Sequence, residues 1–423
     1  MLLTETFRPM NRKSDKNLVV GLDIGTSKVM AIVGEYVPGE PIEVIGVGSH
    51  TSRGMKKGVV VEIESNVNSI QRAVEEAGQM AGCDIRSVCA SISGSHLETH
   101  NSRGTAAIRD REVAAGDLDQ VLESASAVAI PADRKVLYKE PQEYRIDGQD
   151  GIRHPVGMSG VRLEAGVHLV TGAASAVQNI TKCIQRCGLA VDDLVPSAVA
   201  SSKAVLTDDE RELGVCVVDL GAGTTDIAIF THGSIRYTKS LPVGGDQVTS
   251  DISQYVQTPT TNAEEIKVKY GCALAQLARG EETIQVPSVG ERPPRRLQRQ
   301  ALAQSIQARY EEIFEMVQDE MRRSGYENLL AAGVVLTGGA ARIEGALYLA
   351  EEVFHKMVRL GVPQHVTGVT EVIATPANAA GVGLLLQGSH SHGGGGSRMI
   401  GGAMGDSVAG LFGKAKGWLH RNF

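Results

Sequence analysis

The chain has 423 residues, of which 42% are apolar, so it can bury sizeable cores and is not a disordered chain. At roughly 150 residues per domain, this length predicts two or three domains or one large two-lobed fold. The net charge of −7 argues against a general nucleic-acid binder, and the 49 glycines exceed the usual share of about 7%, which predicts turns that approach a ligand closely.

Residues 1–16 contain no long apolar segment, so we expect a disordered N-terminus rather than a secretory signal. No apolar run reaches the roughly 18 residues that cross a bilayer, which predicts a soluble, cytoplasmic bulk. The six cysteines form no CxxC pair or zinc spacing. Cys183 and Cys187 lie four residues apart on an expected helix, where packing as small apolar residues is favoured over a metal or redox pair.

The first half of the chain alternates strands and helices. Residues 17–37 predict a hairpin around a glycine-rich turn, followed by a strand at 42–50. Apolar residues then recur every three or four positions over 59–81, which predicts a helix. Later elements are predicted from the same patterns: a strand restarting at 87–98, a helix at 117–128, mostly strand over 136–170, and a helix at 176–188.

Residues 213–230 repeat the design of the first hairpin. An apolar strand, an aspartate, a glycine-rich turn and a second apolar strand place Asp219 against Asp23, 196 residues earlier. This spacing indicates two related halves, a repeat far longer than that of a solenoid. Further elements are expected downstream: a charged helix at 262–274, a Pro- and Arg-rich connector at 287–300, an amphipathic helix at 302–323, and a strand, glycine turn and helix within 331–345, the helix beginning near 341.

The glycine turns predict a phosphate site of a particular kind. The Walker motif G-x-x-x-x-G-K-[ST] is absent. Two hairpin turns that face each other can instead clamp phosphates with backbone N–H groups, helped by the hydroxyls of nearby Ser and Thr. Asp23 and Asp219 would need Mg²⁺ between themselves and the phosphates, held through its waters. A purely structural role for all three turns is the alternative.

These turns resemble motifs of the actin, Hsp70 and sugar-kinase superfamily. Residues 23–27 (DIGTS) and 219–226 (DLGAGTTD) resemble its two phosphate motifs, and 336–341 (LTGGAA) resembles its adenosine motif. The resemblance is closer to the FtsA family of bacterial cell-division proteins and covers nearly the whole chain, including EEIKVKYGCA and VPSVGERPPRRLQRQ. It implies an α/β, two-lobed actin-like (ribonuclease-H-like) ATPase fold with a relocated small subdomain and a C-terminal amphipathic helix.

The resemblance also implies a site for ATP and magnesium. The residues that it assigns to phosphate, magnesium and adenosine are Asp23, Gly25, Thr26, Ser27, Asp219, Gly221, Gly223, Thr224, Thr225, Gly338, Gly339 and Ala340. Glu264 and Lys267 match the pair that reaches the ribose or base, although without the resemblance they suggest an ordinary surface ion pair. No group is assigned to activate water, with Asp226 a candidate by position alone, so at most a slow ATPase is expected.

The domain boundaries follow from the same resemblance. Segments around 197–202 and 378–383 resemble the two connecting segments that form the hinge. The expected parts are a first lobe of 17–84, 165–200 and 375–386, an inserted interaction subdomain of 85–164, a second lobe of 201–240 and 310–374 with its small subdomain of 241–309, a flexible Gly/Ser linker of 387–406, and a helix of 407–423.

The last 17 residues predict an amphipathic helix that lies in the membrane interface. Apolar residues gather on one face and basic residues on the others. The residues expected to meet the membrane are Leu411, Phe412, Lys414, Trp418, Leu419 and Arg421. Anionic lipid would add about 1 kcal/mol per basic residue. Docking of the helix on the protein itself is the alternative, which the flexible linker disfavours.

A basic cluster predicts a partner site. Arg295, Arg299 and Arg309, with Glu312 close to the last, suit a carboxylate-bearing peptide, although a merely solvated basic face is the alternative. The resemblance implies that the partner is the C-terminal tail of FtsZ. It also implies self-association into filaments, recruitment of later divisome membrane proteins, and a location on the cytoplasmic face of the inner membrane at the division site. Nucleic acid is not expected, because no aromatics are interleaved with the arginines.

Three other functions compete with this interpretation. An MreB-like cell-shape filament on the membrane shares the nucleotide motifs but lacks this tail arrangement. A sugar kinase would need a catalytic base beside the terminal phosphate and has no use for a membrane tail. An Hsp70-like chaperone would continue into a β-rich domain, whereas only a linker and one helix are expected after residue 387.

Overall fold

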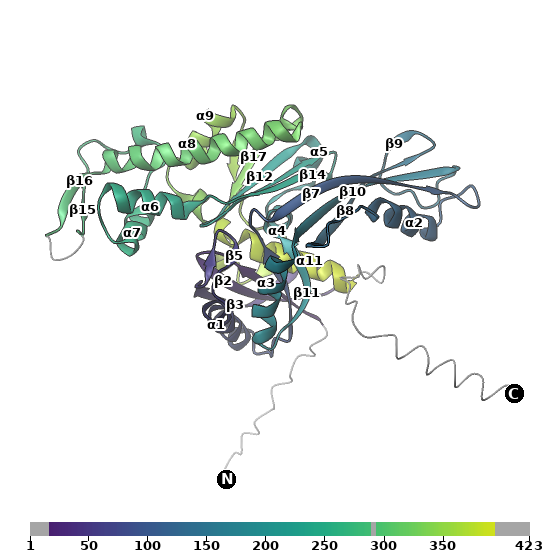
Figure 1. Cartoon of the computed structure of the whole chain (residues 1–423), viewed down its shortest axis with the longest axis horizontal. Helices are drawn as coiled ribbons and strands as arrows, with labels where there is room; N and C mark the ends of the chain where they lie inside the picture. The colour runs from purple at the N-terminus through teal and green to yellow at the C-terminus, as the bar shows by residue number, and fades with distance from the viewer. Residues whose placement is uncertain (1–16, 289–292, 394–423) are drawn as a thin grey trace, which may run out of the picture. The chain divides into compact units, whose positions relative to one another are not determined.

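Each half of the chain folds around a mixed β-sheet that begins with a hairpin (Figure 1). The computed structural model describes residues 17–288 and 293–393. The first sheet contains, in order, β11 (Ala190–Pro196), β6 (Ser87–Ile92), β1 (Leu18–Ile24), β2 (Lys28–Glu35), β3 (Ile42–Thr51) and β19 (Val366–Gly368). The second contains β14 (Ser234–Leu241), β13 (Thr225–Thr231), β12 (Val215–Leu220), β17 (Val334–Thr337) and β18 (Val358–Leu360).

The two sheets repeat one topology. In the first lobe β1 pairs antiparallel with β2 and parallel with β6, and in the second lobe β12 pairs antiparallel with β13 and parallel with β17. Asp23 lies opposite Met30, and Asp219 lies opposite Asp226. The predicted internal repeat is therefore confirmed, and both aspartates lie near the ends of equivalent strands.

Helices cover both sheets. Those of the first lobe and its connections are α1 (Ile63–Ala81), α3 (Ala174–Arg186), α4 (Ser197–Val205) and α11 (Ala379–Gly393). Those that follow α4 and belong to the second half are α5 (Asp208–Leu213), α6 (Gly245–Tyr255), α7 (Thr260–Tyr270), α8 (Arg299–Ser324) and α9 (Ala346–Phe354), with a short α10 (Thr370–Ile373) near the return to the first lobe. Single-turn 3-10 helices are η2 (Ala275–Leu277), η3 (Glu327–Leu329), η4 (Gly339–Arg342) and η5 (Pro376–Asn378). Small hairpins pair β4 (Met55–Lys56) with β5 (Val59–Val60) and β15 (Thr283–Val286) with β16 (Arg295–Gln298).

The long helix α8 fills the core of the second lobe. Its fully buried Tyr310 and Phe314 meet edge to face, with ring centroids 5.8 Å apart. Phe314 in turn meets Phe354 of α9 at 5.4 Å. Since few aromatics are present in the chain, this cluster concentrates much of the large apolar surface of the lobe at one place.

The inserted subdomain is a separate four-stranded sheet with one helix, α2 (Ala115–Ser126). Its strands, in order across the sheet, are β7 (Leu97–Ala107), β10 (Arg162–Ala173), β8 (Arg134–Ile146) and β9 (Gln149–Ile152). The chain enters it from β6 and leaves it into α3, so its covalent connections are to the first lobe. Its side chains, however, bond the edge strand of the second sheet: the Asn101 amide donates to Arg236 O at 2.8 Å and the Thr99 hydroxyl donates to Thr238 O at 3.2 Å. These bonds satisfy backbone groups that an edge strand leaves unpaired.

Two expected boundaries of the inserted subdomain need correction. The expectation of 85–164 placed β6 inside it, but β6 pairs with β1 and β11 in the first sheet. Strand β10 also continues to Ala173. Hydrophobic alternation identifies a strand but not the sheet that it joins, which explains both differences.

Two expected helix starts are also wrong. The helix expected from residue 59 begins at Ile63, because the preceding residues form the β4–β5 hairpin around Gly58, which has a φ of +77°. The helix expected near Ala341 is a 3-10 turn, η4, and α9 begins at Ala346 after a left-handed Gly345.

The linker expected from Gln387 begins too early. Helix α11 continues to Gly393, and Gly388 and Ser389 are buried. A Cβ at Gly388 would lie 2.5 Å from Val19 Cγ1, so glycine allows the helix to pack closely on β1. The small residues at 388 and 389 therefore allow close packing of a helix and do not mark a flexible linker. The rest of the expected linker and all the expected membrane residues, 411–421, lie outside the described residues. Within the described ranges no helix is long and apolar enough to span a membrane.

We predict that acid weakens the contact between the inserted subdomain and the second lobe. The buried His168 ring bonds Asn101 Oδ1 at 2.8 Å and Thr238 Oγ1 at 3.2 Å, and burial, with a contribution from His100, lowers its pKa to about 4. The unfolded histidine titrates near 6.5, so the unfolded state binds more protons between pH 4 and 6.5 and stability falls as the pH falls through this window. At pH 5 the loss should be about 2 kcal/mol.

Urea unfolding at pH 5 and pH 7.5 checks this expectation. His168→Gln should lose less stability on acidification than the wild type does. The comparison must be a difference between the two proteins, because buried aspartates with raised pKa values act in the opposite sense in the same window. Equal losses in both proteins would contradict the assignment.

Candidate functional site

The two glycine-rich turns meet each other. The Gly25 N–H closes the first turn by donating to Lys28 O at 3.0 Å, and the Gly221 N–H closes the second by donating to Thr224 O at 2.9 Å. A Cβ on Gly223 would lie only 2.9 Å from the Cβ and Cγ2 of Thr26. The structure therefore brings the tips of both turns, one from each lobe, into contact, and a side chain at position 223 would force them apart.

Three aspartates lie beside the two turns, and each accepts a hydrogen bond from a different serine. Ser91 Oγ donates to Asp23 Oδ1 at 2.8 Å, and Ser201 of α4 donates to Asp219. The third pair joins Ser93 to Asp226, at 2.7 and 2.8 Å to the two carboxylate oxygens.

The carboxylates are buried together, which disfavours their charged forms. Burial, reinforced by the Asp226 carboxylate, raises the pKa of Asp219 to about 7, and burial raises that of Asp226 to about 6. Burial also raises the pKa of Asp23. Lys28 contributes one ammonium group, which donates to Asn378 Oδ1 at 2.6 Å and whose own pKa is lowered by burial. Lys28 offsets part of this negative charge, and among the described residues no group of three or more His, Cys, Asp or Glu side chains is arranged to hold a metal ion directly.

The third turn lies next to the second. Gly338 ends β17 with a φ of +90°, and a Cβ there would overlap Asp219 Oδ1, so only glycine fits. Gly339 and Ala340 begin η4, and Tyr310 Oη donates to Ala340 O at 2.8 Å. The predicted adenosine motif is thus held against the second turn by the core of the lobe.

Glu264 and Lys267 come to the same place from α7. Lys267 Nζ lies 2.7 Å from Glu264 Oε2 and donates to Gly245 O at 3.0 Å and to Thr249 Oγ1 at 2.7 Å. A Cβ at Gly245 would contact Ala340 at 3.3 Å. Only 12% of the Lys267 side chain is exposed, so Lys267 is part of a packed junction of α6, α7 and η4, whereas 47% of the Glu264 side chain is exposed to solvent.

The two segments expected to form the hinge pack on each other. A Cβ at Gly383 of α11 would overlap Ala200 O of α4, so the backbones of the two helices are in direct contact. Helix α4 also supplies Ser201 to the site, and η5, just before α11, supplies Asn378. The segments that connect the lobes therefore also supply side chains to the site.

Of the four predicted partner residues, three are already paired within the chain: Arg299, Arg309 and Glu312. Arg299 bonds Glu282 at 3.1 Å and also Glu344, and Arg309 bonds Asp251 and Glu312. Arg295 lies exposed on β16. The structure thus leaves Arg295, more than Arg299 or Arg309, accessible to a partner.

Similarity to known proteins agrees with this geometry. The chain is 57% identical to the cell division protein FtsA of Pseudomonas aeruginosa over 409 residues, covering 96% of this chain and 98% of that protein. The chain belongs to the FtsA family. It is also 49% identical to cell division protein FtsA of Escherichia coli K12 over 390 residues, 90% of this chain and 93% of that one. The family model of cell division protein FtsA matches residues 216–383, and that of the SHS2 domain inserted in FtsA matches 94–171.

Solved structures show the same fold at low sequence identity. The PilM–PilN type IV pilus biogenesis complex aligns with a TM-score of 0.61 at 16% identity, covering 88% of this chain and 98% of that one. MreB5 of Spiroplasma citri bound to ADP aligns with a TM-score of 0.52 at 13% identity, covering 89% and 97%. The fold is thus that of the actin-like ATPases, and the inserted subdomain matches the SHS2 domain model.

Several residues of the site were not found from the sequence. The residues that the structure adds are Lys28, Ser91, Ser93, Ser201, Asn378 and Ser240. Single serines carry no motif of their own. The one available signal was the alternation of Ser91 and Ser93 at the end of a strand, which places both side chains on one face.

Proposed function

We propose that this chain is an ATP-binding, polymerising protein of the divisome, which anchors FtsZ filaments to the cytoplasmic face of the bacterial inner membrane and recruits later division proteins. The observation that carries the proposal is the contact between the two turns, Gly223 against Thr26, beside the partly buried Asp23 of the first lobe and the buried Asp219 and Asp226 of the second. A ligand with several phosphates suits two such turns, because backbone N–H groups and hydroxyls of both can bind it.

The residues present fit ATP with magnesium. Backbone groups at Gly223 and the Thr26 hydroxyl would bind the phosphates. The Gly25 N–H and the Thr224 hydroxyl, which here donate to Lys28 O and to Asp226, would have to exchange these bonds for the ligand. Asp23 and Asp219 would hold magnesium through its waters, and the ion would offset their mutual repulsion. In the described structure Ser91 contacts only Oδ1 of Asp23, which leaves Oδ2 for this role. Gly338, Gly339 and Ala340, with Glu264 and Lys267, would receive the adenosine.

Nucleotide binding would regulate assembly through the hinge. A ligand that contacts both turns favours the arrangement in which they meet. Because α4 and α11 pack backbone to backbone, a change in the angle between the lobes must alter that contact. We therefore expect ATP to favour one conformation for self-association.

Vesicle co-sedimentation tests the membrane part of the proposal. The full chain with Mg·ATP should pellet with anionic vesicles at least tenfold better than a chain ending at Gly393, which keeps all of α11. Phe412→Glu in the full chain should behave like the truncation, because it places a charge on the expected apolar face. Lys414→Gln is the matched control and should weaken binding only a few-fold. Equal pelleting of the full and shortened chains would overturn the membrane role.

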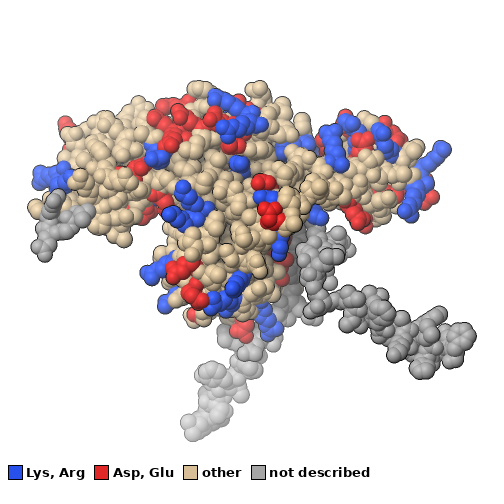
Figure 2. All heavy atoms as spheres, viewed as in Figure 1, with Lys and Arg blue, Asp and Glu red and all other residues tan. Residues whose placement is uncertain are grey.

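Binding of the FtsZ C-terminal peptide tests the partner site. Figure 2 shows Lys and Arg side chains gathered beside the β15–β16 hairpin, where Arg295 and Arg296 are exposed. Arg295→Glu should weaken binding about tenfold without changing the melting temperature. Arg309→Glu should lower the melting temperature, because it breaks the pair with Asp251.

Fluorescence anisotropy with a labelled peptide measures the affinities. Arg72→Glu, an exposed arginine on α1, is the control and should bind as the wild type does. If Arg295→Glu and the wild type bind the peptide equally, the β16 surface is not the docking site.

A further inference from the structure

Ser93 stands where the chain leaves the first lobe and enters the inserted subdomain. It follows the last residue of β6 and precedes β7. Its hydroxyl contacts three side chains of the second lobe: both oxygens of Asp226, Thr224 Oγ1 at 3.0 Å and Ser240 Oγ at 3.1 Å. The next residue, Gly94, donates its backbone N–H to Ser240 Oγ at 3.0 Å. The root of the inserted subdomain is therefore bonded to the second turn and to the end of β14.

This cluster is buried and well satisfied. Asp226, Ser240 and Thr224 are each less than 10% exposed. Thr224 Oγ1 donates to Asp226 Oδ2 at 3.0 Å, and Ser240 is also a hydrogen-bond partner of the same carboxylate. A carboxylate offers about four acceptor positions, and hydroxyls from three residues occupy them here. Asp226 is thus used to hold the cluster together and is poorly placed to accept a proton from water, the role that its position in the sequence suggested.

We propose that Ser93, Asp226 and Ser240 form a latch that positions the second turn and couples its occupancy to the inserted subdomain. The coupling has a continuous path. Strand β13 begins at Thr225, directly after the second turn, and pairs with β14, whose backbone accepts hydrogen bonds from Thr99 and Asn101 of the inserted subdomain. The latch adds a second, shorter link at the root. The proposal deepens the proposed function, since it names how nucleotide at this site is sensed elsewhere.

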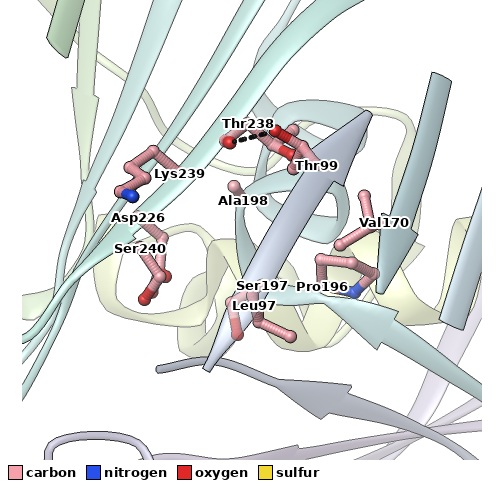
Figure 3. Close-up of a pocket in the computed structure, with 10 residues that line it drawn as sticks. All are labelled: Leu97, Thr99, Val170, Pro196, Ser197, Ala198, Asp226, Thr238, Lys239 and Ser240. Carbon is pink, nitrogen blue, oxygen red and sulfur yellow. Dashed lines mark hydrogen bonds between the residues drawn. The ribbon is translucent and has the colours of Figure 1, made fainter. Parts of the chain in front are cut away.

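A small cavity lies beside the latch. It lies where the inserted subdomain, α4 and the β13–β14 hairpin meet, and Asp226 and Ser240 line it together with apolar side chains such as Leu97, Val170 and Ala198 (Figure 3). Figure 3 also shows the Thr99–Thr238 bond, and both threonines line the same cavity. The latch and the bond to the edge strand therefore lie around one junction of the inserted subdomain with the second lobe.

Hydrogen–deuterium exchange on the full-length protein, with and without Mg·AMPPNP, tests the latch. In the wild type, nucleotide should slow exchange in β13–β14 and also in β7 and β10 of the inserted subdomain. In Ser93→Ala, nucleotide should still protect the two turns, but the protection of β7 and β10 should fall at least fivefold. Ser93→Thr, which keeps the hydroxyl, should restore it. Ser102→Ala, a partly buried serine of β7 outside the cluster, is the matched control and should respond as the wild type does.

The outcomes separate this proposal from the proposed function. If nucleotide protects β7 and β10 equally in the wild type and in Ser93→Ala, or protects the turns of the wild type without reaching these strands, the latch is overturned. If the wild type binds no nucleotide by calorimetry, the proposed function fails instead. The latch is then tested by comparing the two nucleotide-free proteins. Ser93→Ala should exchange at least tenfold faster than the wild type in both β14 and β7, and unchanged exchange would overturn the latch.

Discussion

Asp219→Asn should abolish magnesium-dependent nucleotide binding and, at the same time, make the nucleotide-free protein more stable. The first effect follows from the loss of a buried negative charge beside the two turns, and we expect affinity for Mg·ATP to fall at least 100-fold. The second follows from the burial of Asp219 near Asp226 and Asp23, which raises its pKa to about 7. An amide of the same shape can still accept the hydrogen bond from Ser201 but carries no charge.

The raised pKa of Asp219 determines how the stability difference between the variant and the wild type changes with pH. The folded protein keeps a proton on Asp219 up to about pH 7, whereas the unfolded chain releases it near pH 3.8. The folded state therefore binds more protons between these values, and the stability of the wild type falls as the pH rises from about 4 to 7. At pH 8, Asp219→Asn should be more stable by about 2 to 4 kcal/mol, and the difference should shrink toward pH 5.

Denaturant unfolding at pH 5 and pH 8, with calorimetry for Mg·ATP, measures both effects. Asp209→Asn removes an exposed carboxylate on α5 and should change stability by no more than about 0.5 kcal/mol. A variant that binds Mg·ATP as tightly as the wild type would remove Asp219 from the site. A variant less stable than the wild type at pH 8 would show that the carboxylate is stabilising where it lies.

Gly383→Ala should destabilise the protein by about 3 kcal/mol or more, the cost of forcing atoms into a filled contact. The added methyl group would overlap Ala200 O, a backbone atom of a fully buried helix, so neither side can yield without moving α4 or α11. Since α4 carries Ser201, the same change should also weaken nucleotide binding, although position 383 is not among the residues that would contact the ligand.

Gly116→Ala is the matched control, another glycine in a helix. It lies exposed in α2, and nothing lies within 4 Å of the position of its Cβ. There alanine should be neutral or stabilise by about 0.5 to 1 kcal/mol, because it lowers the entropy of the unfolded chain. Urea midpoints of the two variants compare them directly. If both variants shift the urea midpoint by similar amounts, the α4–α11 contact can adjust to an added methyl group, and the backbone-to-backbone contact does not constrain the two helices.

The sequence predicted most of the fold because the fold is repeated. Two hairpins with an aspartate before a glycine turn, in matching positions of the two halves, predicted two lobes and the meeting of Gly223 with Thr26. The glycine turns of the site were predictable for the same reason. Gly223 and Gly338 lie so close to Thr26 and Asp219 that a larger residue would not fit. The errors were at the ends of elements. Gly58 forms the β4–β5 turn where a helix was expected to begin, and Gly388 packs against Val19 where a linker was expected.

The side chains that complete the site could not be predicted. Ser91, Ser93 and Ser201 come from β6, its following loop and α4, which are distant in the chain and become neighbours only when the sheets pair. The pairs of Arg299 with Glu282 and of Arg309 with Asp251 join residues 17 and 58 positions apart, so a cluster of arginines in the sequence did not show which of them stays exposed. Such information is set by tertiary packing rather than by local pattern.

Two serines at the end of β6 bond aspartates of different lobes, so the register of this strand determines both bonds. Ser91 reaches the aspartate of one lobe, and Ser93, two residues later, reaches an aspartate of the other. Side chains alternate along a strand, so insertion or deletion of a single residue in β6 before Ser91 would turn the Ser91 hydroxyl to the opposite face, and it would also displace Ser93, which directly follows the strand. We expect such a length change to break both serine–aspartate bonds in one step, an effect that no point substitution at either serine could reproduce.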